Sequence, residues 1–113
     1  MQTLPTPESP PTFHDKHLHV DLNQQAVMLD GETVRLTPMQ YRLLALLVEH
    51  AGVVVSRPIL LMQIWRCAPE IHQHKVDTCI RGLRKKLGVC ADHYIETVIG
   101  VGYRFRPLVP ASD

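Results

Sequence analysis

The segment from His72 to Leu87 constrains the fold more than any other part of the chain, because it has the periodicity of a helix with one narrow apolar stripe. Four apolar residues fall within about 60° of one another on a helical projection: Val76, Ile80, Leu83 and Leu87. Such a helix packs along one line and exposes its opposite face. We expect that face to hold His74, Thr78, Arg81, Gly82 and Lys85, with Lys75, Arg84 and Lys86 at its flanks.

Positive charge is concentrated in the same segment, although the 113 residues together carry a net charge of only +1. Residues 1–56 contain three Lys or Arg and six Asp or Glu, a net charge of −3, whereas residues 57–113 contain nine and five, a net charge of +4. Between residues 72 and 88, five basic side chains accompany one acidic side chain, Asp77. A local patch of this kind can bind a polyanion even when the total charge is near zero.

Two further helices are predicted upstream. Thr37 can cap a helix that has Pro38 at its first position and Gln40 closing a capping box, and Gly52 can end it. Ser56 can cap a second, shorter helix. The residues expected to recur on the core-facing sides of these helices are Tyr41, Leu44, Leu47, Val48, Ile59, Leu60, Ile64 and Trp65.

Short strands are predicted on both sides of the helices. Turn signals at Asn23-Gln24 and Asp30-Gly31 divide the N-terminal part into antiparallel strands, which we place at Leu18–Leu22, Ala26–Leu29 and Thr33–Leu36. After the third helix, runs at Tyr94–Val98 and Tyr103–Arg106 flank a glycine-containing tip, which predicts a hairpin. Arg104 and Arg106 share one face of that hairpin by the two-residue period.

This order of elements predicts an α+β fold of the winged helix-turn-helix type: a small N-terminal antiparallel sheet, three helices, and a C-terminal β-hairpin wing. The third helix would enter the major groove of DNA, where Arg and Lys reach guanine and Thr reaches base edges. We divide the chain into a Pro-rich leader at 1–14, a winged-helix DNA-binding domain at 15–108, and a tail at 109–113.

Four segments of the sequence resemble one family, the effector domains of OmpR/PhoB-type response regulators. They are LTPMQYRLL (36–44), VVSR (54–57), VDTCIRGLRKKLG (76–88) and TVIGVGYRF (97–105), in order and at compatible spacing. The resemblance covers about residues 18–106. It implies a four-stranded N-terminal sheet, with another strand around Thr12 to His14. It also implies the output domain of a bacterial two-component transcriptional regulator, with an upstream receiver domain that we expect to be absent from this chain.

The resemblance also implies partners and residue roles. It places Lys75, Thr78, Arg81, Gly82 and Lys85 at the major groove, and Arg84 and Lys86 nearer phosphates. The tip at Thr97 to Val101 would be the wing, near the minor groove, and the loop from Arg66 to Gln73 matches the segment that contacts RNA polymerase in some relatives. We expect a monomer in solution that pairs head to tail on direct-repeat DNA. Together with His74, Thr97, Ile99 and Arg104, these are the candidate DNA-binding residues.

Two positions depart from the family pattern. Many relatives have Arg where Ile99 stands, and often a basic residue at Gly82. We therefore consider that Ile99 presses on sugars or packs against a neighbouring subunit, and that the affinity of one domain for DNA is lower than usual.

Other classes of function have less support in the sequence. The histidine pairs 17/19 and 72/74 do not complete a four-ligand set at zinc spacing, so we predict no metal and no cofactor. No phosphate-binding Gly-rich loop or nucleophile elbow is present, so we predict no enzyme. The rival interpretation is a fold that docks a protein, with an incidental basic face. The salt dependence of the affinity distinguishes DNA binding from protein docking, because only DNA binding depends on counterion release.

The sequence also bears on location. The longest aliphatic run, Leu43 to Val48, is far shorter than the roughly 20 residues of a membrane-spanning helix. The three cysteines, an odd number at wide spacing, favour free thiols in a reducing compartment. We therefore expect a cytoplasmic protein with no membrane partner.

Overall fold

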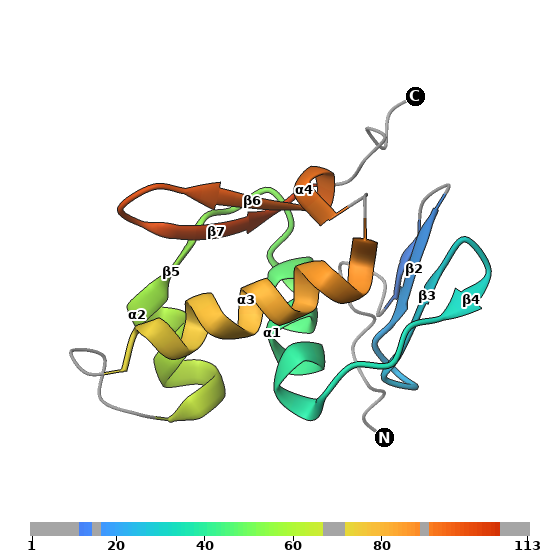
Figure 1. Cartoon of the computed structure of the whole chain (residues 1–113), viewed down its shortest axis with the longest axis horizontal. Helices are drawn as coiled ribbons and strands as arrows, with labels where there is room; N and C mark the ends of the chain where they lie inside the picture. Colours follow the sequence, from blue (N-terminus) through green and yellow to red (C-terminus); the bar gives the residue numbers. More distant parts are fainter. Residues whose placement is uncertain (1–11, 15–16, 67–71, 89–90, 107–113) are drawn as a thin grey trace, which may run out of the picture.

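The computed structural model describes residues 12–14, 17–66, 72–88 and 91–106. A four-stranded antiparallel sheet (order β1-β2-β3-β4) lies at one end of the molecule, at the right in Figure 1. A three-stranded sheet (order β5-β7-β6) lies above the helices in the same view. The winged-helix architecture predicted from the sequence is therefore present.

The N-terminal sheet consists of β1 (Thr12–His14), β2 (Leu18–Asp21), β3 (Ala26–Leu29) and β4 (Glu32–Thr33). The strand that the family resemblance implies around residue 12 is confirmed, since Phe13 pairs with Val20 in the adjacent strand. The ring of Phe13 also meets that of Phe105 edge to face, with 4.9 Å between centroids. The boundary predicted at residue 14 is therefore wrong: the sheet already includes Thr12–His14. The last strand is also shorter than predicted, because pairing with β3 ends at Thr33.

Helix α1 (Pro38–Glu49) begins as the sequence predicts. The backbone N–H of Gln40 donates to Thr37 Oγ1 over 3.1 Å, and the backbone N–H of Thr37 donates to Gln40 Oε1 over 3.0 Å, which completes the capping box. Buried Leu43, Leu44, Leu47 and Val48 form its core-facing side.

The second helix is less regular than predicted. Helix α2 (Arg57–Leu60), capped by Ser56, continues into a π-helical turn, η1 (Leu61–Trp65). The turn ends at Arg66, whose φ of 57° is left-handed. Ile59, predicted to face the core, is 51% exposed. The buried residues of this segment are Leu60, Leu61 and Ile64, so the buried side begins one residue later than predicted.

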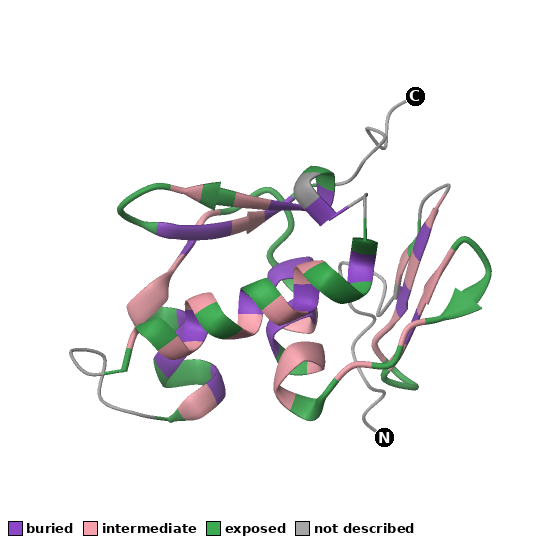
Figure 2. Cartoon of the chain, in the orientation of Figure 1, coloured by how far each residue is buried: buried purple, intermediate pink, exposed green. Residues whose placement is uncertain are grey.

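Helix α3 (His74–Leu87) lies along the middle of the molecule (Figure 1). It starts two residues later than predicted, because His72 has a left-handed φ of 74° that a helix cannot include. The predicted stripe is confirmed: Val76, Ile80, Leu83 and Leu87 are its buried residues. Figure 2 shows the resulting alternation of buried and exposed residues along the helix.

The C-terminal part contains α4 (Ala91–Tyr94), β6 (Ile95–Val98) and β7 (Gly102–Phe105), joined by the wing turn. Tyr94, predicted to begin a strand, ends the short helix and stacks on Phe105 in the core, with 5.9 Å between centroids. A third strand, β5 (Val55–Ser56), pairs with β7. Gly102 permits this pairing, since a Cβ there would lie 2.0 Å from the carbonyl oxygen of Val55.

One apolar core joins all of these elements, and it includes residues of both sheets and of the three main helices. Within the described residues, no helix is long and apolar enough to cross a bilayer.

Candidate nucleic-acid interface

The outer face of α3 displays four side chains to solvent: His74, Thr78, Arg81 and Lys85. Neither Arg81 nor Lys85 has a hydrogen bond or ion pair within the part of the chain that the structure describes. All four side chains carry a hydrogen-bond donor that can reach an anion or a base edge. Positive charge and hydrogen-bond donors on the exposed face of a helix suit the major groove.

Gly82 faces a different direction from the one predicted. A Cβ at Gly82 would lie 2.7 Å from Nε2 of Gln40, so this position of α3 faces α1. The helical projection placed it on the exposed side because the projection measures the angle from the apolar stripe only. The amide of Gln40, rather than a side chain at 82, therefore occupies this flank of the face.

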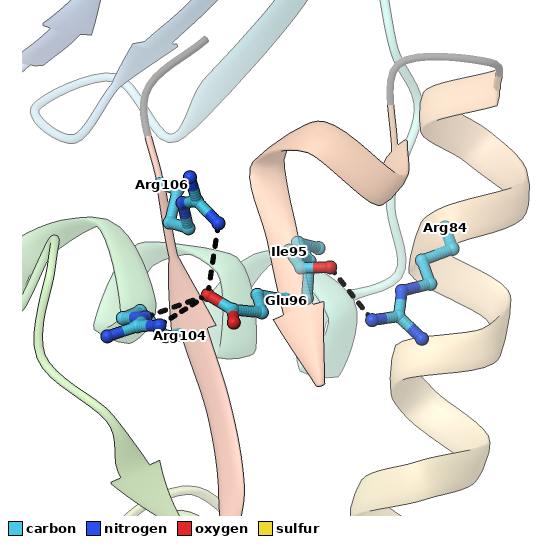
Figure 3. Close-up of polar contacts among 5 residues, drawn as sticks. All are labelled: Arg84, Ile95, Glu96, Arg104 and Arg106. Atoms are coloured by element: carbon cyan, nitrogen blue, oxygen red, sulfur yellow. Dashed lines mark hydrogen bonds and ion pairs between the residues drawn. The ribbon is translucent and has the colours of Figure 1, made fainter. Parts of the chain in front are cut away.

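The two flanking basic residues assigned to phosphates both have hydrogen-bond partners within the chain. Arg84 Nη2 donates to the carbonyl oxygen of Ile95 and to Thr97 Oγ1, both over 2.8 Å (Figure 3 shows the first contact). Lys86 Nζ donates to the carbonyl oxygen of Arg35 over 2.8 Å. Arg84 thus ties α3 to the first strand of the wing, and its Nε is buried without a partner among the described residues.

The base of the wing contains a second ionic cluster. Arg104 donates twice to Oε1 of Glu96, at 2.9 and 2.7 Å, and Arg106 lies 3.5 Å from the same oxygen (Figure 3). The hydrogen bond from Arg104 and the nearby positive charges hold the pKa of Glu96 below its ordinary value. Arg104 and Arg106 share a face as predicted, but the charge of Arg104 is partly neutralised by Glu96.

A third cluster connects α2, α3 and the wing. Asp77 Oδ1 accepts hydrogen bonds from Tyr103 Oη (2.5 Å) and Arg57 Nε (2.8 Å). The guanidinium of Arg57 also lies over the ring of Tyr103, 5.0 Å from its centroid. Burial raises the pKa of Asp77, but the hydrogen bonds from Tyr103 and Arg57 outweigh it and hold the pKa below its ordinary value. The one acidic residue of α3 is therefore neutralised by partners from other elements.

The wing tip is apolar and projecting. Ile99 is 90% exposed and Val101 is 45% exposed, while Gly100 has the positive φ of 81° that the turn requires. Thr97 is exposed beside the tip and accepts the hydrogen bond from Arg84. Thr97 and Ile99, both predicted to belong to the wing, are thus exposed, but neither side chain is charged.

A hollow of about 410 Å³ lies between α3 and the wing sheet. Its polar lining comes from Asp77, Arg81, Arg84, Lys85 and Tyr103. Three of these five are basic, so the space between the helix and the wing is suited to an anionic group.

No set of three His, Cys, Asp or Glu side chains in the described ranges is arranged to hold a metal ion.

Lys75, expected at the major groove, is half-buried at the start of α3.

Three helices, an exposed basic face on the third, and a hairpin fixed beside it define a winged helix-turn-helix domain of the DNA-binding class. The family comparison agrees. Residues 31–105 match the family described as "Transcriptional regulatory protein, C terminal". The chain belongs to this family, the DNA-binding domains of OmpR/PhoB-type response regulators.

Named relatives come from several bacteria. The chain is 42% identical to the transcriptional regulator HilA of Salmonella typhimurium over 94 residues, which are 80% of this chain and 17% of HilA. It is 38% identical to the transcriptional regulatory protein SrrA of Staphylococcus aureus, over 80% of this chain and 39% of SrrA. The chain therefore spans well under half the length of these relatives.

Solved structures show the same fold. The DNA-binding domain of Klebsiella pneumoniae RstA, in complex with the RstA box, has a TM-score of 0.77 and 34% identity, over 85% of this chain and 97% of that chain. The DNA-binding domain of Escherichia coli CpxR has a TM-score of 0.76 and 31% identity, over 88% and 99%.

Several residues that shape this surface have no local signal in the sequence. Gln40 was recognised only as a cap, and the roles of Arg57, Asp77 and Tyr103 were not predicted. Their partners lie 20 to 46 positions apart in the sequence. One indication was available: a lone acidic residue on a basic helix requires a cationic or hydroxyl partner when it is partly buried.

Proposed function

We propose that this domain binds double-stranded DNA sequence-specifically, with α3 in the major groove, as the output domain of a two-component transcriptional regulator. The observation that carries the proposal is the outer face of α3, where Arg81 and Lys85 are exposed and unpaired within the described residues. Arg84 and Asp77 of the same helix are hydrogen-bonded to the wing sheet, which fixes the helix relative to the wing. The similar RstA DNA-binding domain was solved in complex with the RstA box, which supports DNA binding by this domain.

The wing would lie near the minor groove, beside the phosphates that border it. Ile99 at its tip can contact sugars through its apolar side chain, while the hollow lined by Arg81 and Arg84 can accept a backbone phosphate. In this arrangement Arg84 acts chiefly by positioning Thr97 and the wing.

The proposal includes partners outside this chain. We infer head-to-tail pairing on direct-repeat DNA, regulation by an upstream receiver domain, and contact with RNA polymerase through the loop from Arg66 to Gln73. Residues 67–71 of that loop lie outside the described ranges. We infer a cytoplasmic location and a binding role without catalysis, because the family consists of DNA-binding domains of transcription factors.

The proposal is tested by selecting duplexes from a random pool with the purified domain and measuring their binding by gel shift. The wild-type chain should enrich a common motif, and Thr78→Ala should relax the preference at one position of it. Arg42→Ala is the matched control, since Arg42 is exposed on α1 and does not belong to the α3 face. Failure of the wild type to enrich any motif would contradict sequence-specific binding by this domain.

A further inference from the structure

The outer face of the N-terminal sheet carries a row of three metal-ligating side chains that the winged-helix function does not use. His14 pairs directly with His19 across β1 and β2, and His19 pairs directly with Met28 across β2 and β3. Direct cross-strand neighbours share a face, with Cβ atoms about 4.5–5.5 Å apart. The opposite face of the same strands holds Val20 and Val27 in the core, so the row faces away from the core.

The separation of the two imidazoles suits a shared ion. Their ring centroids lie 5.2 Å apart with an interplanar angle of 89°. A metal–nitrogen bond of about 2.0 Å, extended by the radius of each ring, places the centroids of two imidazoles on one trigonal or tetrahedral ion about 5–5.5 Å apart. Neither imidazole has a hydrogen bond or ion pair within the described residues, so rotation of either ring breaks no such contact.

The residues around the two imidazoles form a hollow that can hold the ion and bring negative charge close to it. His14, His19 and Met28 line one hollow of about 220 Å³. His17 and Asp30 lie at the same hollow, and His17 Nδ1 is 2.7 Å from Asp30 Oδ1. Because His17 engages the carboxylate, Asp30 contributes negative charge near the hollow rather than a free ligand.

The donor set selects the metal. Two imidazoles and one thioether make a soft, three-coordinate set, and thioether ligands favour copper(I) over zinc, magnesium or calcium. We propose that His14, His19 and Met28 form a copper(I)-binding site on the outer face of the N-terminal sheet. Because it links β1, β2 and β3, bound copper fixes the three-residue strand β1 onto the sheet. The site is independent of DNA binding by α3.

The test is an anaerobic titration of copper(I) against a chromophoric chelator, made with the three cysteines changed to serine because thiolates compete for this ion. The chain should bind one equivalent. His14→Ala and His19→Ala should each weaken binding at least tenfold, and Met28→Leu should weaken it several-fold. The Met28 methyl resonance should shift on addition of copper(I).

The matched control is His72→Ala. His72 and His74 are another neighbouring histidine pair, with ring centroids 6.1 Å apart, and neither lines the hollow that His14, His19 and Met28 share. Copper(I) affinity should not change in this variant. Unchanged affinity in either His14→Ala or His19→Ala, or an equal loss in His72→Ala, would overturn the site. Unchanged affinity in Met28→Leu would overturn Met28 as a ligand and with it the donor set that selects copper(I).

Discussion

Changing Tyr103 to Phe removes one hydroxyl and tests whether the cluster around Asp77 holds the wing to α3. The hydroxyl donates to Asp77 Oδ1 over 2.5 Å, and the Tyr103 residue is only 4% exposed. The ring of Phe keeps the packing and the stacking with Arg57. The substitution therefore removes this hydrogen bond and the longer one that Arg57 Nη2 donates to the hydroxyl over 3.5 Å, and little else.

The expected loss follows from the charge and exposure of the acceptor. A hydrogen bond to a charged group contributes about 1.5–3 kcal/mol. Because the side chain of Asp77 is 41% exposed, water replaces part of the lost interaction, and we expect the free energy of unfolding to fall by about 1–2 kcal/mol at pH 7. For a domain of this size, that lowers Tm by about 5–10 °C.

The pH dependence identifies the acceptor. Because the hydrogen bonds hold the pKa of Asp77 below its unfolded value, their contribution is present above the unfolded pKa of about 3.9 and is lost as pH falls through the folded pKa. The stability difference between wild type and Tyr103→Phe should therefore narrow below about pH 4.

Denaturant unfolding of both proteins between pH 3 and pH 7 measures this difference. Tyr41→Phe is the control, since Tyr41 is partly buried but has no hydroxyl partner among the described residues. Equal stability of Tyr103→Phe and wild type at pH 7 would refute the reasoning. So would a difference that stays constant down to pH 3.

Three further predictions concern other parts of the molecule. Ile99→Arg adds a cation to the wing tip, where Ile99 is 90% exposed, so DNA affinity in a gel-shift titration should rise several-fold at low salt; no change would mean that the tip does not approach phosphates. Gly102→Ala should lower the free energy of unfolding by about 3 kcal/mol, because its Cβ would meet the backbone of Val55 at 2.0 Å; near wild-type stability in denaturant would contradict the β5–β7 pairing. Burial raises the pKa of the Cys79 thiol to about 11, so its alkylation at pH 8, followed by peptide mass spectrometry, should be about a hundredfold slower in the folded than in the unfolded chain; comparable rates would contradict its burial.

Local signals predicted much of the fold. The capping box at Thr37 places the start of α1 correctly, because both of its hydrogen bonds lie within four residues. The apolar stripe of α3 is also correct, since a single narrow stripe leaves no ambiguity about which side is buried.

The elements that were missed depend on distant contacts. Strand β5 has two residues and exists because β7, 46 positions later, pairs with it, so no local period reveals it. The helical projection also gave the angle of Gly82 and Arg84 from the stripe but not the neighbours at each flank. Gln40 of α1 lies against Gly82, which is therefore a packing position. Ile95 of β6 accepts a hydrogen bond from Arg84, which therefore holds the wing to α3.

The central claim is that the outer face of α3 binds DNA, and a fluorescence-anisotropy titration with duplex DNA at two salt concentrations tests it most directly. We predict that affinity falls steeply with salt and that Arg81→Ala and Lys85→Ala each weaken binding by about 1–3 kcal/mol. Arg42→Ala, which removes the same charge from α1, should bind like wild type. Equal affinities of Arg81→Ala, Lys85→Ala and wild type would contradict the claim.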